Sequence, residues 1–156
     1  MNIVSLKKWF MTGMRTNDNS RYRLSRLLNR EKYLESSILR QRIEQFPPDE
    51  LFTTIITFEE QMRGWLAFIA KAKTPEQQIY AYERLHRSLE AYRNTTVLDF
   101  DENAASVFKD LKSQKIRVGA MDLKIAAIVI SRNAILVSRN LRDFEEVPGL
   151  VVKDWT

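Results

Sequence analysis

The side chains best suited to chemistry lie in the last third of the chain. Asp122 opens an apolar stretch that predicts a helix, and a negative charge in the first turn of a helix is favoured by the helix dipole. The short apolar run 134–137 then predicts a strand, and Ser138, Asn140 and Asp143 follow it. Binding sites in open α/β sheets lie outside the carboxyl ends of the strands. Oxygen donors from a helix start and a strand end can therefore converge there on a divalent cation.

The segments that must position these side chains alternate between predicted strands and predicted helices. Residues 51–56 are rich in β-branched and aromatic residues, which predicts a buried strand, and Thr57 is expected to open a helix that ends near residue 72. Thr74 followed by Pro75 is typical of a helix start, and this helix is expected to end near residue 93. The remaining predicted elements are strand 96–98, helix 101–114, the Asp122 helix with an apolar face of Ile125, Ala126, Val129 and Ile130, strand 134–137, and a strand near 150–152. Strands that alternate with helices predict an α/β fold with a parallel sheet.

The composition is that of an ordinary globular domain. At 156 residues the chain is long enough for one domain with a normal core, and a hydrophobic share of 44% argues against extensive disorder. No apolar run is long enough to cross a membrane, and the first lysines follow a short apolar patch, whereas a secretory signal would place them before a longer one. The chain has no cysteine, which excludes disulfides and thiolate chemistry and favours a cytoplasmic setting.

The net charge of +5 is concentrated in the first third of the chain. Residues 1–46 carry 10 Lys/Arg and 4 Asp/Glu, whereas the remaining residues carry 15 and 16. Residues 1–20 are expected to be irregular, and a helical period follows from about residue 21 to 45. This basic part could attract phosphate backbones, although a solvated helix face is an equally good interpretation.

Several motifs, taken in order, resemble those of the VapC-type toxins, which are PIN-domain ribonucleases of toxin–antitoxin pairs. The motifs are the strand-then-helix segment Ile55–Trp65 with Glu60, the pair Met121-Asp122, the turn Ser138–Phe144 with Asn140 and Asp143, and the closing segment Val147–Trp155. The resemblance runs from about Leu27 to Trp155. It divides the chain into a divergent basic N-terminal segment, 1–26, and a PIN-like domain, 27–156.

The resemblance implies a three-layer α/β fold in which helices flank a short parallel sheet. It also implies a metal-dependent endoribonuclease, in which Asp122, Glu60 and Asp143 hold Mg²⁺ or Mn²⁺ and Asn140 is a further candidate for the site. The implied substrate is RNA. The implied partners are an antitoxin protein that covers the groove and a second copy of the chain in a homodimer.

Each candidate residue also has an interpretation without chemistry. Asp122 could serve only the helix dipole, which is worth roughly 0.3–1 kcal/mol. Glu60 lies three residues after Thr57, which is the spacing of a capping box. Asn140 and Asp143 could satisfy backbone groups in a turn, as Asn and Asp often do.

The chain departs from the family at its N-terminus. Family members open with an apolar strand that ends in Asp, and this Asp is a principal metal ligand. Here the first acidic residue is Asp18, which lies between two asparagines and has no apolar run before it. The sequence therefore predicts that the N-terminal strand is absent and that the nuclease is weakened. The alternative is a catalytically inactive PIN-like domain that binds an antitoxin or RNA.

Overall fold

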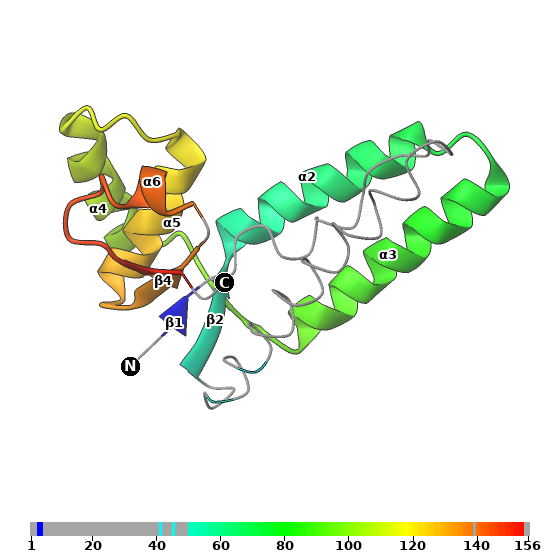
Figure 1. Ribbon diagram of the computed structural model, residues 1–156, viewed down its shortest axis with the longest axis horizontal. Helices are drawn as coiled ribbons and strands as arrows, with labels where there is room; N and C mark the ends of the chain where they lie inside the picture. Colours follow the sequence, from blue (N-terminus) through cyan, green and yellow to red (C-terminus); the bar gives the residue numbers. More distant parts are fainter. Residues whose placement is uncertain (1–2, 5–40, 42–44, 46–49, 139, 155–156) are drawn as a thin grey trace.

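Short parallel strands form one sheet with helices packed around it (Figure 1). The computed structural model describes residues 3–4, 41, 45, 50–138 and 140–154. The strands are β1 (Ile3–Val4), β2 (Leu51–Thr54), β3 (Thr96–Leu98), β4 (Ile135–Val137) and β5 (Val151–Lys153). The helices are α2 (Ile55–Lys71), α3 (Pro75–Arg93), α4 (Glu102–Ser113), α5 (Ala120–Ser131) and the short α6 (Leu141–Phe144). The predicted α/β fold with a short parallel sheet is confirmed.

The sheet has the strand order β3-β2-β1-β4-β5, so the strand nearest the N-terminus lies at its centre. Ile3 pairs with Leu51 of β2 on one side and with Ile135 of β4 on the other, both in parallel. The prediction that the N-terminal strand is absent is therefore wrong. Ile and Val are β-branched and suit a strand, but a two-residue run is too short to show any alternation in a sequence. The division of the chain at residue 26 stays a prediction.

The helix α2 begins earlier than the sequence predicts. Thr54 ends β2 and is the N-cap of α2, because its side chain accepts a hydrogen bond from the backbone N–H of Thr57 at 3.1 Å. The two threonine hydroxyls also lie 2.9 Å apart. The prediction of Thr57 as N-cap is wrong because the strand passes directly into the helix. The predicted start of α3 is confirmed. Thr74 is the N-cap, Pro75 is the first helical residue, and Thr74 and Gln77 form a capping box.

The helix α5 is the centre of the hydrophobic core. Its residues 125–129 are fully buried, although the sequence predicts a single apolar face. The helix is buried this widely because it contacts α4, α2 and β4. Burying one large aliphatic side chain contributes roughly 1.5–3 kcal/mol, so α5 is held firmly in place.

The helices α2 and α3 form a hairpin that projects away from the other labelled helices (Figure 1). Aromatic rings join the two helices: the centroids of Phe58 and Tyr92 lie 4.8 Å apart and those of Phe68 and Tyr80 lie 6.2 Å apart. Burial raises the pKa of Tyr92 to about 12, so its phenol stays neutral. None of the described helices is both long enough and apolar enough to span a membrane.

Candidate functional site

The topology gathers the candidate residues towards one edge of the sheet. The carboxyl ends of the strands share an edge because each strand pair in the described structure is parallel. The strand order reverses between β1 and β4, and such a switch point is where open α/β sheets bind ligands. The helix α2 continues directly from β2 and α6 follows β4, while α5 leads into the start of β4. The start of α5 therefore lies towards the edge at which β2 and β4 end.

Asp122 is the third residue of α5, and its predicted place in the first turn of the helix is confirmed. Asp122 is half-buried. Its carboxylate lies close to the N-cap residue Gly119, since a Cβ atom at Gly119 would be only 3.5 Å from Asp122 Oδ2. The next residue, Leu123, is buried in the core. The carboxylate is thus fixed to a rigid element at the edge of the sheet, where the positive end of the helix dipole favours its charge.

Glu60 is the sixth residue of α2 and is half-buried. Because Thr54 caps this helix, the capping-box interpretation of Glu60 is wrong. The neighbouring Glu59 pairs with Arg63 one turn further on, with Arg63 Nη2 2.5 Å from Glu59 Oε1. Glu59 is therefore paired within its own helix.

Asn140 and Asp143 are in direct contact. The Asn140 side-chain amide donates a hydrogen bond to Asp143 Oδ2 at 2.7 Å, and both residues are half-buried. The backbone N–H of Asn140 donates to the hydroxyl of Ser138, which is 3% exposed. The segment after Asn140, which the sequence predicts to be a turn, forms the short helix α6. Asn140 lies directly before its first residue, and its side chain makes no cap hydrogen bond to the helix. The contact was missed from the sequence, although a spacing of three residues in a helical turn would have indicated it.

These residues fit a Mg²⁺ or Mn²⁺ ion in the kind of donor but not in number. Carboxylate and amide oxygens are the ligands that both ions prefer. Among the described residues, however, no three His, Asp or Glu side chains lie close enough together to hold a metal ion. The structure brings Asn140 to Asp143, and it does not gather Glu60, Asp122 and Asp143 into one cluster. No acidic residue follows β1 in the sequence until Asp18, which lies outside the described residues.

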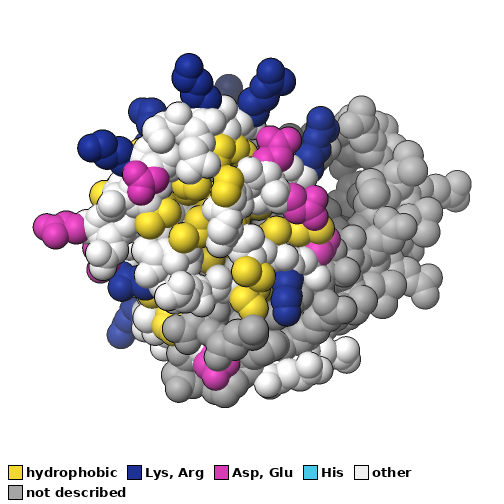
Figure 2. All heavy atoms as spheres, turned by 90° about the vertical axis from the view of Figure 1, so that its left-hand side faces the viewer, with side chains coloured by type: hydrophobic (Ala, Val, Ile, Leu, Met, Phe, Trp, Pro, Cys, Tyr) yellow, Lys and Arg dark blue, Asp and Glu magenta, His cyan; other side chains and the backbone are white. Residues whose placement is uncertain are grey.

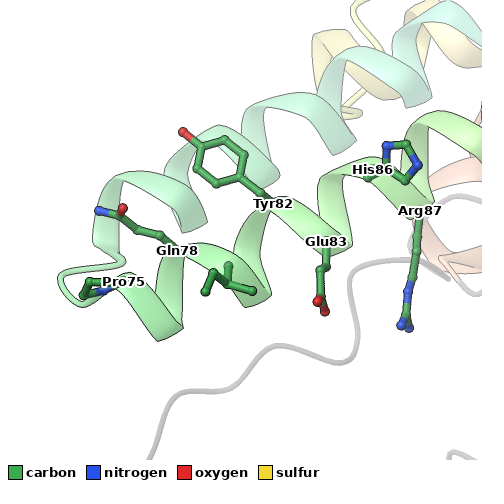
Figure 3. A pocket seen from close by; sticks show the side chains of 7 residues that line it. Pro75, Gln78, Tyr82, Glu83, His86 and Arg87 are labelled. Atoms are coloured by element: carbon green, nitrogen blue, oxygen red, sulfur yellow. The ribbon is translucent and has the colours of Figure 1, made fainter.

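A separate shallow hollow of about 770 Å³ lies on the hairpin, along α3 (Figure 3). Its lining residues are Pro75, Gln78, Ile79, Tyr82, Glu83, His86 and Arg87. Ile79 and Tyr82 are 61% and 56% exposed, so large apolar residues lie together at the surface of the hollow. None of the four candidate oxygen donors lines it, so this hollow suits contact with a partner better than catalysis.

Comparison with known proteins identifies the family of the chain. The family described as "PIN domain" matches residues 23–150 of the chain. The chain is 31% identical over 122 residues to "Ribonuclease VapC1" of Haemophilus influenzae (strain R2866), covering 76% of this chain and 85% of that protein. It is 34% identical over 89 residues to "tRNA(fMet)-specific endonuclease VapC" of Salmonella typhimurium, covering 54% of this chain and 63% of that protein.

Solved structures show the same fold. The crystal structure of DNA-bound VapBC from Salmonella typhimurium is similar with a TM-score of 0.62 at 28% identity, over 76% of this chain and 85% of that one. The crystal structure of FitAcB from Neisseria gonorrhoeae has a TM-score of 0.64 over 99% of this chain and 98% of that one, although the identity is 17%. With a family match across most of its length and VapC ribonucleases among its relatives, the chain belongs to the PIN domain family.

Proposed function

We propose that the chain is an endoribonuclease of the VapC toxin type that depends on a divalent cation. The observation that carries this proposal is the placement of half-buried Glu60, Asp122 and the Asn140–Asp143 pair towards the carboxyl edge of a parallel sheet, at its switch point. Relatives that are named ribonucleases support the same reaction class. The proposed substrate is RNA.

Each candidate residue has a distinct task in this proposal. Asp122, Glu60 and Asp143 would bind Mg²⁺ or Mn²⁺. Asn140 would orient Asp143 through the hydrogen bond of 2.7 Å between them. When bound, such an ion supplies positive charge opposite the phosphate and makes a neighbouring water more acidic. The buried body of α5 would hold Asp122 in place throughout.

The same observations favour weak activity. In a metal site, each lost carboxylate lowers the affinity for the cation, and residues 5–17, which follow β1, contain no acid. A second candidate function follows from this point: a catalytically inactive PIN-like domain that binds an antitoxin or RNA. The lack of a three-acid cluster among the described residues favours this second candidate.

The proposed partners are an antitoxin protein and a second copy of the chain. The hairpin supports this proposal because α3 exposes Ile79, Tyr80, Tyr82 and Leu89, while only Ala81 and Ser88 of this helix are buried. Exposed apolar residues that gather on one element mark interaction surfaces. A cytoplasmic location is proposed with these partners.

The two adjacent glutamates of α2 allow a matched test of the proposed cation site. RNA cleavage by the purified chain would be measured with Mg²⁺ or Mn²⁺ and with EDTA, for the variants Glu60→Gln and Glu59→Gln. We expect Glu60→Gln to lower the rate by about 100-fold or more, because changes to outer partners of metal ligands alone cost 10–100-fold. Glu59→Gln removes only an exposed pair with Arg63 and should leave the rate nearly unchanged. Equal rates for the two variants would contradict the proposed role of Glu60.

A further inference from the structure

A run of exposed basic side chains follows the end of α4 and the connection to α5. It consists of Lys109, Lys112, Lys115 and Arg117, which we call the basic ridge. We propose that the basic ridge binds the sugar–phosphate backbone of single-stranded RNA and leads it to the sheet edge beside Asp122. This inference rests on the proposed function, since it assigns the surface that holds the same class of substrate.

The ridge is distinct from its surroundings in charge. Residues 109–117 contain four Lys/Arg and one acid, Asp110, whereas the rest of residues 47–156 contains 11 Lys/Arg and 15 Asp/Glu. Lys109 and Lys112 are three residues apart on α4, so they are neighbours on one side of the helix, whereas Asp110 faces another direction. The helix dipole favours Lys112 in the last turn of α4, but it does not account for Lys115 and Arg117, which follow the helix.

The charges of the ridge are not neutralised within the described structure. The ion pairs formed there involve Arg63, Arg93 and Arg132, and none uses a residue of the ridge. Lys112 lies over the ring of Phe108, with its Nζ atom 6.0 Å from the centroid, which orients the side chain without cancelling its charge. An exposed and uncompensated run of this kind suits the polyanionic backbone of a nucleic acid.

The ridge lies next to the candidate site. Arg117 is two residues before Gly119, the N-cap of α5, and five residues before Asp122. Figure 2 shows Lys and Arg side chains along the upper rim of the molecule, which is where Figure 1 places the connection between α4 and α5. RNA held along this rim would therefore reach the start of α5 over a short distance.

The backbone at Lys115 is a second, independent sign that the charge matters. Lys115 has a φ angle of 54°, the left-handed conformation that Gly or Asn adopts most easily after a helix. The equivalent place after α5 is occupied by Asn133, with a φ angle of 50°. The chain thus uses a favourable residue at one helix end and an unfavourable lysine at the other. A role in binding accounts for the lysine where backbone preference does not.

The test compares two triple variants with the same change in charge. The ridge variant carries Lys112→Gln, Lys115→Gln and Arg117→Gln, and the control carries Lys71→Gln, Lys73→Gln and Arg93→Gln on the hairpin. Binding of a short labelled single-stranded RNA of mixed sequence would be followed by fluorescence anisotropy over a range of salt concentrations, in EDTA. The salt slope is the change in log affinity per unit change in log salt concentration. It falls by about 0.7 for each phosphate contact that is lost from a single strand. For the ridge variant, which loses three charges, we expect the slope to fall by about 2 and the affinity at 0.1 M salt to fall roughly 100-fold. The control should retain the slope of the original chain.

The single variant Lys115→Asn separates binding from folding. Because Asn suits the left-handed conformation, the urea midpoint of this variant should stay the same or rise, while RNA affinity falls. A lower midpoint with unchanged affinity would show a purely structural lysine and overturn the proposal. Equal RNA binding by the two triple variants would also overturn it. A polyglutamate peptide serves as a second polyanion. The proposal would also be overturned if the ridge variant lost binding to this peptide but kept its binding to RNA.

The binding assay in EDTA is independent of cleavage. Ridge-dependent RNA binding by a chain that does not cleave RNA in Mn²⁺ would support the ridge and contradict the proposed nuclease. Cleavage that is unchanged in the ridge variant, together with unchanged binding, would contradict the ridge alone.

Discussion

The helix α5 and the hairpin of α2 and α3 are built in opposite ways. The residues 125–129 in the middle of α5 are fully buried, and the helix contacts α4, α2 and β4. On α3 only Ala81 and Ser88 are buried, although this helix is longer and carries several large hydrophobic residues on its surface. The first element is held by the core on every side, whereas the second presents an apolar surface to its surroundings.

The two elements suit different functions. A carboxylate that must be held within a fraction of an ångström belongs on a rigid, buried element, as Asp122 does at the start of α5. A surface that must meet a partner needs exposed apolar side chains, as the hairpin has. We therefore propose chemistry at the sheet edge and association at the hairpin, and each proposal can be tested by changing matched residues in the two regions.

The largest contrast is expected from removing the same side chain in each region. Ile128→Ala in α5 creates a cavity in the core and should lower the free energy of unfolding by about 2–5 kcal/mol. Ile79→Ala on α3 removes an exposed side chain and should change it by about 0.5 kcal/mol or less. Urea denaturation of the two variants measures both values. A similar loss for the two would mean that the hairpin surface is covered, for example in a dimer.

A smaller contrast is expected between the two helix caps of the hairpin. Thr54 is fully buried where the hairpin joins the sheet, and its hydroxyl also contacts that of Thr57, whereas Thr74 is exposed near the tip. Thr54→Ala should cost about 2 kcal/mol and Thr74→Ala about 0.5–1 kcal/mol. Thermal or urea unfolding would show the difference. Equal costs would show that burial at the base adds nothing to the cap.

The smallest effect concerns pH. A hydrogen bond from the backbone N–H of Ala104 holds the pKa of Asp101 below its ordinary value of 3.8, and Arg132 lowers it further. Because the pKa is lower in the folded chain, Asp101 stabilises the fold above its ordinary pKa, and this contribution is lost as the pH falls through the folded value. Asp101→Asn should therefore weaken the dependence of the urea midpoint on pH between about pH 5 and pH 3.

A control for this pH effect is Asp110→Asn, which changes an exposed carboxyl of the same helix. This variant keeps the contacts of Asp101 with Ala104 and Arg132, so the pH dependence of the urea midpoint should change less than in Asp101→Asn. An unchanged dependence in Asp101→Asn, or the same change in both variants, would contradict the role of Asp101 in joining α4 to the end of α5 through Arg132.

The sequence predicts the elements that local signals define. The strand at 96–98 and the helix that starts at Pro75 were predicted with the bounds that the structure has, and the local signal for the helix was Thr74 followed by Pro75. The two-residue strand β1 was predicted to be absent because no local pattern marks it. Ile3 and Val4 form a strand because they pair with β2 on one side and with β4 on the other. The start of α2 was misplaced because Thr54 and Thr57 are both good caps, and only the register of β2 decides between them.

The candidate site was predicted in its residue types but not in its contacts. The place of Asp122 at a helix start follows from the sequence, because an acid before an apolar stretch is a local signal. The hydrogen bond between Asn140 and Asp143 depends on the short helix α6, which was expected to be a loop. The sharing of one cation by Glu60, Asp122 and Asp143 stays a prediction, since it depends on side chains from three separate elements.

RNA cleavage by the original chain and by Asp122→Asn, each measured with Mn²⁺ and with EDTA, tests the proposed cation site most directly. Asp110→Asn serves as the matched control, because it makes the same chemical change on an exposed part of α4. We expect cleavage in Mn²⁺ by the original chain and by the control, and a loss of about 100-fold or more in Asp122→Asn and in EDTA. Cleavage that persists in Asp122→Asn, or no cleavage by the folded original chain, would contradict an RNA-cleaving centre at this edge of the sheet.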